Sequence, residues 1–161
     1  MAFQNQVYTD VASGVPGDPA TPNQAIYTAI NYTAEMTCTV GHFVFESATN
    51  PQSMASPSGT KPLGLVQRVI NYVDYNVISP GTMEIPDGGT LTVAVRGDFW
   101  AVSNTAAAVG DAVFVDTGNG MISTAAAGST VQNAIETGWK VKTPGSAGEP
   151  IIISSWESMP A

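Results

Sequence analysis

Short apolar stretches separated by turn-forming residues recur along most of this chain, and they limit its fold more than any other feature. In residues 90–102 the odd positions Leu91, Val93, Val95, Phe99 and Ala101 are apolar, whereas the even positions are mostly small or polar. A repeat of two residues is typical of a strand with one buried face. Residues 112–116 are apolar at successive positions, which predicts cover on both faces by a second sheet or another subunit. Further strands are expected at residues 39–45, 63–69, 72–78, 131–135, 139–142 and 151–156.

Helical periodicity is scarce, and only residues 22–35 suit a short helix. We therefore predict an all-β fold, a compact sandwich or barrel with at most one short helix. Residues 1–24 are expected to form an extended N-terminal arm, because three prolines remove backbone donors and restrict φ there. Residues 25–161 are expected to form a single β domain, and a chain of this size can bury a stable core without a disulfide or a metal.

A six-residue pattern occurs twice in the chain. Residues 40–45 read Val-Gly-His-Phe-Val-Phe, and residues 109–114 read Val-Gly-Asp-Ala-Val-Phe. A glycine after an apolar residue supplies a tight turn, after which a strand begins. One short echo does not establish a repeat, so the pattern predicts only that the same turn into a strand is used at both places.

Charged residues make up 11% of the chain, well below the roughly 25% of an ordinary soluble domain. A surface with few charged residues is suited to being buried against other subunits. Thirteen acidic and five scattered basic residues give a formal net charge of −8, so direct binding to nucleic acid or to a membrane is not expected. Cys38 is the single cysteine, and a free thiol together with a start unlike a signal peptide suits synthesis in a reducing cytoplasm.

The most tempting catalytic motif is Asp-Thr-Gly at residues 116–118. Aspartic proteases hold their carboxylates in such a turn, and a homodimer would supply the second carboxylate. The next residue, however, is Asn119, where that family has a small residue, and the run suits a tight β-turn better. His42 is the only histidine, and Cys38 is expected to be a buried, inert thiol. The sequence therefore predicts no enzyme, no cofactor and no metal site.

Eight motifs follow one another in a fixed order, at residues 3–7, 16–18, 40–43, 62–68, 83–88, 96–100, 109–113 and 152–156. Together they resemble the structural cement protein family of tailed bacteriophages, and Arg-Gly-Asp-Phe-Trp at residues 96–100 is the most distinctive match. Two loop segments, residues 46–60 and residues 120–130, match nothing in that family. The resemblance implies a non-enzymatic subunit that binds the outer surface of the capsid and bridges capsomers to stabilise the DNA-filled head. The implied partners are the major capsid protein and other copies of this chain, with a trimer favoured over a dimer. The implied location is the outer surface of the virion, after synthesis in the cytoplasm of the host bacterium.

Apolar residues of the arm are candidate contacts with the capsid or with other subunits. These residues are Phe3, Val7, Tyr8, Val11 and Val15. We expect them to become ordered on a neighbouring surface at a reduced entropic cost, because the prolines already restrict the segment.

Trp100 is the second candidate contact. Phe99 and Trp100 are adjacent, so on a strand they point to opposite faces. Phe99 is expected in the core, whereas Trp100 is expected on the polar face, either available to another subunit or packed under a loop. An alternative function is a carbohydrate-binding β-module on a phage or bacterial surface, in which Trp100, Trp139 and Trp156 offer stacking platforms. The aromatic residues do not cluster in one segment, which argues against this alternative.

Overall fold

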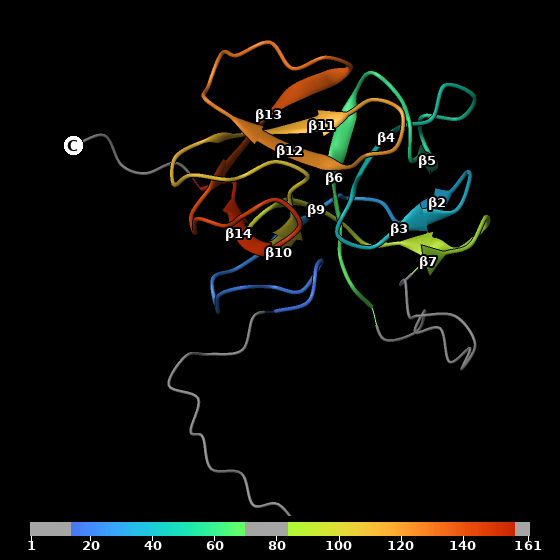
Figure 1. Ribbon diagram of the computed structural model, residues 1–161. Coiled ribbons are helices and arrows are strands. Elements are labelled where there is room, and N and C mark those ends of the chain that lie inside the picture. The colour runs from blue at the N-terminus through green and yellow to red at the C-terminus, as the bar shows by residue number, and fades with distance from the viewer. Residues whose placement is uncertain (1–13, 70–83, 157–161) are drawn as a thin grey trace, which may run out of the picture.

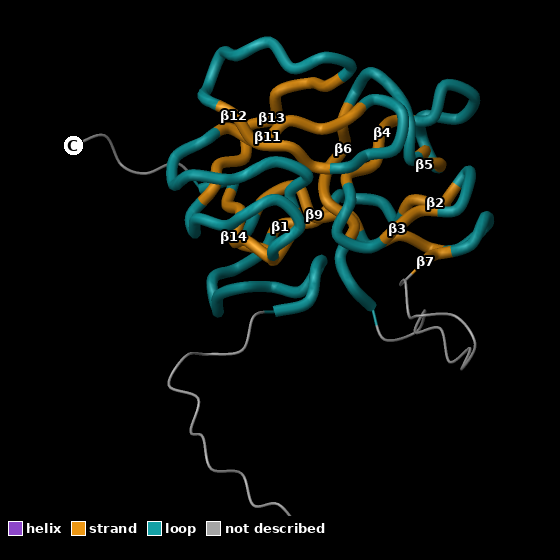
Figure 2. The backbone as a smooth tube through the Cα atoms, in the orientation of Figure 1, coloured by secondary structure: helices purple, strands orange, loops and turns teal. Residues whose placement is uncertain are grey.

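The computed structural model describes residues 14–69 and 84–156, and these residues form three sheets without a helix (Figures 1 and 2). This confirms the all-β prediction. The strands form open sheets packed face to face rather than a closed barrel, so the sandwich is the form adopted. Within the described ranges, no helix is long and apolar enough to cross a membrane.

The largest sheet has seven strands. In sheet order they are β1 (Ile26–Tyr27), β9 (Val93–Arg96), β6 (Pro62–Val66), β4 (Phe43–Glu46), β5 (Met54–Ser56), β2 (Tyr32–Ala34) and β8 (Thr90–Leu91). The second sheet has five strands, β10 (Asp98–Val102), β14 (Pro150–Ser154), β13 (Ala134–Val141), β11 (Ala112–Asp116) and β12 (Ile122–Ala125). A small third sheet pairs β3 (Cys38–Thr39) with β7 (Glu84–Ile85).

The seven-stranded sheet is covered on both faces, so the protein has three layers. In β4, Phe43 and Phe45 belong to the core shared with the five-stranded sheet. Val44 points the other way, into a second core that contains Cys38 of β3 and Ile85 of β7. Successive side chains of a strand point to opposite faces, so three consecutive apolar residues serve two cores.

The two large sheets share one topology. In chain order the strands β1, β4, β5, β6 and β9 form a first unit, and β10, β11, β12, β13 and β14 form a second unit. In both units the sheet order is first, fifth, fourth, second, third, and every one of these pairs is antiparallel. The third strands of the two units, β5 and β12, are also alike in that each has a parallel partner on its outer side. β2 pairs with β5 in parallel, and Ser103 makes a parallel bridge with Ile122 of β12.

The repeated sequence pattern marks equivalent turns in the two units. Gly41 and Gly110 both have positive φ, +79° and +92°. The amide of Gly41 donates to the carbonyl of Val66, the last residue of β6, at 2.9 Å. The amide of Gly110 donates to Val141, the last residue of β13, also at 2.9 Å. The expected turn into a strand is therefore confirmed at both places. The likeness between the two places is not limited to six residues, because the two sheets that contain them also have the same strand order.

Residues 90–102 do not form the single regular strand that their alternation predicted. The chain is divided among β8, β9 and β10, and at Gly97 it passes from the seven-stranded sheet to the five-stranded one. Gly97 has a φ of +143°, and a Cβ atom there would lie 2.7 Å from the ring of Phe99. Because the face that is buried changes at this point, Val95 is 38% exposed whereas Phe99 is fully buried. A glycine is needed for both the backbone angle and the close approach.

The pairing of strands also changed the type or the bounds of other elements expected from the sequence. The segment 22–35, expected to suit a short helix, contains β1 and β2, because their backbones pair with β9 and with β5 and β8. Residues 131–135 and 139–142 were expected as separate strands, but β13 runs through both from Ala134 to Val141. The strand expected at 72–78 lies outside the described residues.

Candidate functional site

Residues 14–24, here called the strap, lie along the outer edge of β10. The amide of Gly17 donates to the carbonyl of Trp100 at 2.8 Å, and the amide of Trp100 donates to Asp18 at 3.0 Å. Ala20 donates to the carbonyl of Asp98 at 2.8 Å, and Pro19 forms an antiparallel bridge with Phe99. The described part of the predicted arm is therefore paired with this chain's own edge strand.

Asp98 anchors the C-terminal half of the strap through its side chain. Its Oδ2 accepts hydrogen bonds from Thr21 Oγ1 and from Asn23 Nδ2, both at 2.7 Å. Burial alone would raise the pKa of Asp98, but hydrogen bonds from Ser154, Thr21 and Asn23 and the nearby charge of Lys142 hold that pKa below its ordinary value. The ionised carboxylate is thus the form that holds the strap.

A second connection ties the strap to the segment that follows β6. The guanidinium Nη1 of Arg68 lies 3.1 Å from Asp18 Oδ2. The backbone amide of Arg68 donates to the carbonyl of Gly17 at 3.0 Å. The strap therefore contacts β10 of the second unit and the segment that follows β6 of the first unit.

Replacing Asp98 with Asn is expected to lower the free energy of unfolding by about 1–3 kcal/mol near neutral pH, because charge-assisted hydrogen bonds to the strap are weakened. A carboxyl whose pKa is lowered by folding contributes stability above its unfolded pKa and loses it as the pH falls through the folded pKa. The difference between wild type and Asp98→Asn should therefore shrink below about pH 4. Urea unfolding at neutral and acidic pH measures it. The matched control is Asp87→Asn at an exposed turn, and a difference independent of pH would contradict the role assigned to Asp98.

The candidate contact residues fall in different places. Phe3, Val7, Tyr8 and Val11 lie outside the described residues. Val15, in the strap, is 45% exposed.

Trp100 is half-buried under the strap. A Cβ atom on Gly14 would lie 2.2 Å from the indole of Trp100, so the backbone of Gly14 packs directly against that ring. The face of β10 opposite Phe99 is therefore partly covered by this chain itself.

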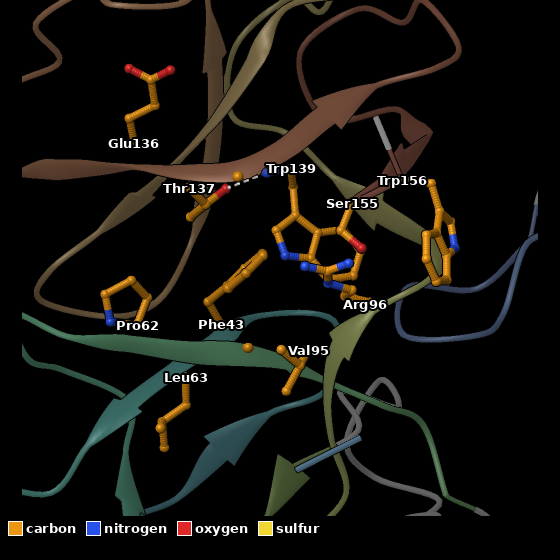
Figure 3. Close-up of a pocket in the computed structure, with 12 residues that line it drawn as sticks. Phe43, Pro62, Leu63, Val95, Arg96, Glu136, Thr137, Trp139, Ser155 and Trp156 are labelled. Atoms are coloured by element: carbon orange, nitrogen blue, oxygen red, sulfur yellow. Dashed lines mark hydrogen bonds between the residues drawn. The ribbon is translucent and has the colours of Figure 1, made fainter. Parts of the chain in front are cut away.

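A groove of about 650 Å³ opens between the two large sheets (Figure 3). The seven-stranded sheet lines it with Pro62, Leu63, Val95 and Arg96, and the other side carries Thr137, Trp139 and Trp156. The guanidinium carbon of Arg96 lies 6.0 Å from the centroid of the Trp156 ring, within the range of a cation–π contact. The lining of the groove is thus polar and apolar in similar measure, and it includes the cation of Arg96 beside an aromatic ring as well as Glu136.

The tempting motif at 116–118 is a turn. Asp116 Oδ1 accepts a hydrogen bond from the amide of Gly118 at 2.7 Å, and the amide of Gly120 donates to the carbonyl of Asp116 at 2.9 Å.

Burial lowers the pKa of His42, and a backbone hydrogen bond at Asn119 opposes that shift only in part. In the parts of the chain that the structure describes, no group of three His, Cys, Asp or Glu side chains could hold a metal ion.

Cys38 is fully buried, and this burial raises the pKa of its thiol to about 11. The thiolate is the reactive form of cysteine. We expect the folded protein to react with a thiol reagent at least about a hundredfold more slowly than the urea-unfolded protein, because both the thiolate fraction and access are reduced. Absorbance of the released thiol-reagent chromophore measures the two rates, and equal rates would contradict the burial of Cys38.

The anchor of the strap is the feature that sequence reasoning missed. Thr21 and Asn23 are separated from Asp98 by 77 and 75 residues. No local spacing connects them. The distinctive Arg-Gly-Asp-Phe-Trp run at 96–100 was the one available signal, since it holds Asp98 together with the sheet-switching Gly97.

Comparisons with known proteins found one matching family model and solved structures of similar fold. A family model described as "Structural cement protein (E217 gp24/Pam3 gp6)" matches residues 3–155. A chain from the structure of the capsid of Myoviridae phage XM1 is similar in fold, with a TM-score of 0.63, 18% identity, and coverage of 96% of this chain and 98% of that chain. The head fiber gp8.5 N base of bacteriophage phi29 gives a TM-score of 0.45 at 11% identity, covering 83% of this chain and 100% of that chain. No curated protein sequence matches. At these identities the first structure shows a shared fold, and the second carries no argument.

Proposed function

Since this chain belongs to the phage structural cement protein family, we propose that it binds the outer surface of the capsid and bridges neighbouring capsomers, so that the DNA-filled head is stabilised. The observation that carries this proposal is the family match, which spans residues 3–155 and so nearly the whole chain. A structural role in the virion follows from the family. The position on the outer surface of the capsid and the bridging of capsomers are the parts that we propose.

The build of the protein supports a role as a reinforcing subunit. A capsid wall under pressure from packaged DNA opens where contacts between capsomers break. A subunit that spans such a boundary adds contact area that must also be broken, and interfaces of roughly 1,200–2,000 Å² are firm. Repetition over the shell adds avidity. A body in which one sheet is covered on both faces can carry load between two contacts without opening locally.

The proposed partners are the major capsid protein and other copies of this chain, with a trimer favoured and a dimer as the alternative. The proposed contacts are the arm residues Phe3, Val7, Tyr8, Val11 and Val15, together with the part of Trp100 that Gly14 leaves uncovered. The protein is proposed to act without a cofactor, without direct nucleic-acid or membrane binding, and without enzymatic activity. It would be made in the host cytoplasm and end on the outer surface of the virion.

Binding to phage heads that lack this protein tests the proposal. Purified protein is added to expanded and to unexpanded shells, which are then sedimented and heated. We expect saturable binding at a fixed ratio to coat protein and release of DNA at a higher temperature. The same protein unfolded in urea and diluted at once is the control for nonspecific adhesion. Folded protein that fails to bind either shell would contradict the proposal.

The carbohydrate-binding alternative finds little support in the side chains. Trp139 is 5% exposed, so its ring faces are not available to a sugar. Trp100 is packed against Gly14, and the Trp156 ring already has Arg96 at 6.0 Å. A polysaccharide pull-down separates this alternative from capsid binding.

A further inference from the structure

The groove between the two large sheets contains an arginine that no described carboxylate neutralises. Arg96 points from β9 towards the five-stranded sheet (Figure 3). The ion pairs among the described residues are Lys61 with Glu46 at 3.3 Å and Arg68 with Asp18 at 3.1 Å. The chain has thirteen acidic residues and five basic ones, yet within its described part none of those carboxylates pairs with Arg96. The charge of this side chain therefore remains available to a ligand.

The ring of Trp156 positions the guanidinium of Arg96. The guanidinium carbon lies over this ring, 6.0 Å from its centroid, and the indole is 36% exposed. Contact with the ring face leaves the N–H donors of the guanidinium unoccupied, and no residue of the described ranges accepts a hydrogen bond from them. These donors form a planar fork that fits the two oxygens of a carboxylate. Tryptophan and arginine are also among the side chains that contribute most to binding at protein interfaces.

Glu136, the acidic residue in the lining of the groove, is engaged elsewhere. Its Oε2 accepts a hydrogen bond from the amide of Gly128 at 3.0 Å. Figure 3 shows its side chain on the side of β13 away from Phe43, whereas Thr137 and Trp139 point towards Phe43. The charge that faces the groove is therefore the positive charge of Arg96.

We propose that this groove receives a carboxylate-bearing segment of the major capsid protein, with Arg96 binding the carboxylate and Trp156 packing against the segment beside it. The inference rests on the proposed function, because it names a surface through which the cement subunit holds the shell. The positive charge of Arg96 is complementary to an acidic side chain. The volume of about 650 Å³ lies within the range of about 300–1,000 Å³ that is typical of ligand sites. The groove thus admits a few side chains rather than a folded surface.

Net charge argues against other sources of the anion. Each copy of this chain carries a formal charge of −8, so two copies repel one another apart from the single attractive contact at Arg96. A nucleic acid would meet the same repulsion, and it binds through several cations, whereas the described lining of the groove supplies one. A coat-protein segment has to bring only one acidic side chain to this site.

Charge reversal at Arg96 tests the inference on phage heads. Arg96→Glu is expected to lower the affinity for heads at least about tenfold, because one carboxylate then faces another. Lys140→Glu is the matched control, since Lys140 is also exposed, lies outside the lining of the groove and gives the same change in net charge. It should leave the affinity nearly unchanged. Sedimentation with heads measures both affinities, and urea unfolding checks that both variants are folded.

A zero-length crosslink identifies the group that Arg96 binds. Arg96→Lys keeps the positive charge and introduces an amine. A water-soluble carbodiimide joins this amine to a contacting carboxylate as an amide, and the water that is lost converts the carbodiimide to its urea. Heads carrying the variant and heads carrying wild-type protein are treated in parallel, and crosslinked peptides are identified by mass spectrometry. We expect a crosslink from position 96 of the variant to an Asp or Glu of the major capsid protein. Wild-type protein should give none there, because its guanidinium does not form this amide.

The other outcomes separate the inference from the proposed function. Equal affinities of Arg96→Glu and Lys140→Glu for heads that wild-type protein binds would overturn the inference and leave the function standing. The same holds for a bound Arg96→Lys variant whose position 96 gives no crosslink, or one only to carboxyl groups of this chain in the same or another copy. Wild-type protein that does not bind heads would overturn both.

Discussion

Replacing Gly120 with Ala is expected to lower the free energy of unfolding by about 3 kcal/mol or more. A Cβ atom at this position would lie 2.0 Å from the carbonyl oxygen of Phe43, so two backbones would have to move apart. That movement would also stretch the hydrogen bond from the amide of Phe43 to the carbonyl of Gly120, which is 2.9 Å long. Because this bond joins β4 to the turn between β11 and β12, the change would weaken the connection between the two large sheets.

Gly128→Ala is the matched control for this experiment. Gly120 and Gly128 have similar φ values, +69° and +76°, but a Cβ atom on Gly128 would meet nothing within 4 Å. The control therefore carries only the backbone strain of a non-glycine residue at positive φ, about 1 kcal/mol. Urea unfolding followed by tryptophan fluorescence measures both variants. Equal losses would mean that steric contact with Phe43 contributes nothing.

Phe43→Ala is expected to cost about 3–5 kcal/mol, because it removes a fully buried aromatic ring from the core between the sheets. Phe43 lies in β4 and packs edge-to-face on Trp139 of β13, with ring centroids 5.8 Å apart. Trp139 also contacts Phe99 of β10 at 6.1 Å. Truncating Phe43 therefore removes the aromatic contact of the first unit with the second.

Val109→Ala serves as the control for that truncation, since Val109 is 64% exposed and surface changes of this kind usually stay within about 0.5 kcal/mol. Phe43→Leu should lie between the two, because it keeps part of the buried volume. Urea unfolding gives the free energies, and the change in tryptophan fluorescence between Phe43→Ala and wild type, both carrying Trp100→Phe and Trp156→Phe, reports the lost contact with Trp139. A loss for Phe43→Ala no larger than that for Val109→Ala would show that the two units do not depend on this contact.

These two variants bear on function through the connection between the units. If the protein bridges capsomers, force passes from one unit to the other through the shared core. A variant that remains folded at room temperature but has lost this connection should bind heads and raise the temperature of DNA release less than wild type does. Head-binding assays with Phe43→Leu therefore distinguish attachment from reinforcement.

Local patterns in the sequence were sufficient for much of the fold. Successive apolar residues at 112–116 predicted a strand covered on both faces, and β11 has those bounds with Val113, Phe114 and Val115 all buried. The alternation around Phe99 placed its ring in the core correctly. Gly41 and Gly110 marked turns that the structure confirms. In each case the signal depends on a residue and its immediate neighbours, which is the information that periodicity and turn chemistry carry.

The resemblance carried by ordered motifs was likewise available in the sequence, and the family match confirms it. No single motif was specific enough to identify the family. The order of the motifs along nearly the whole chain was specific enough, because chance matches do not keep the order of a family.

Pairing between distant segments was decided only by the tertiary structure. The alternation at 90–102 continues through Gly97, yet the chain changes sheets there because β9 pairs with β6 while β10 pairs with β14. Within residues 22–35, β1 and β2 formed because partners from distant parts of the chain satisfied their backbone groups. Asp98 became an anchor because Thr21 and Asn23 meet it across more than seventy residues of chain. Alternation shows that a strand has a buried face, but which sheet covers that face depends on contacts that form only when the whole chain packs.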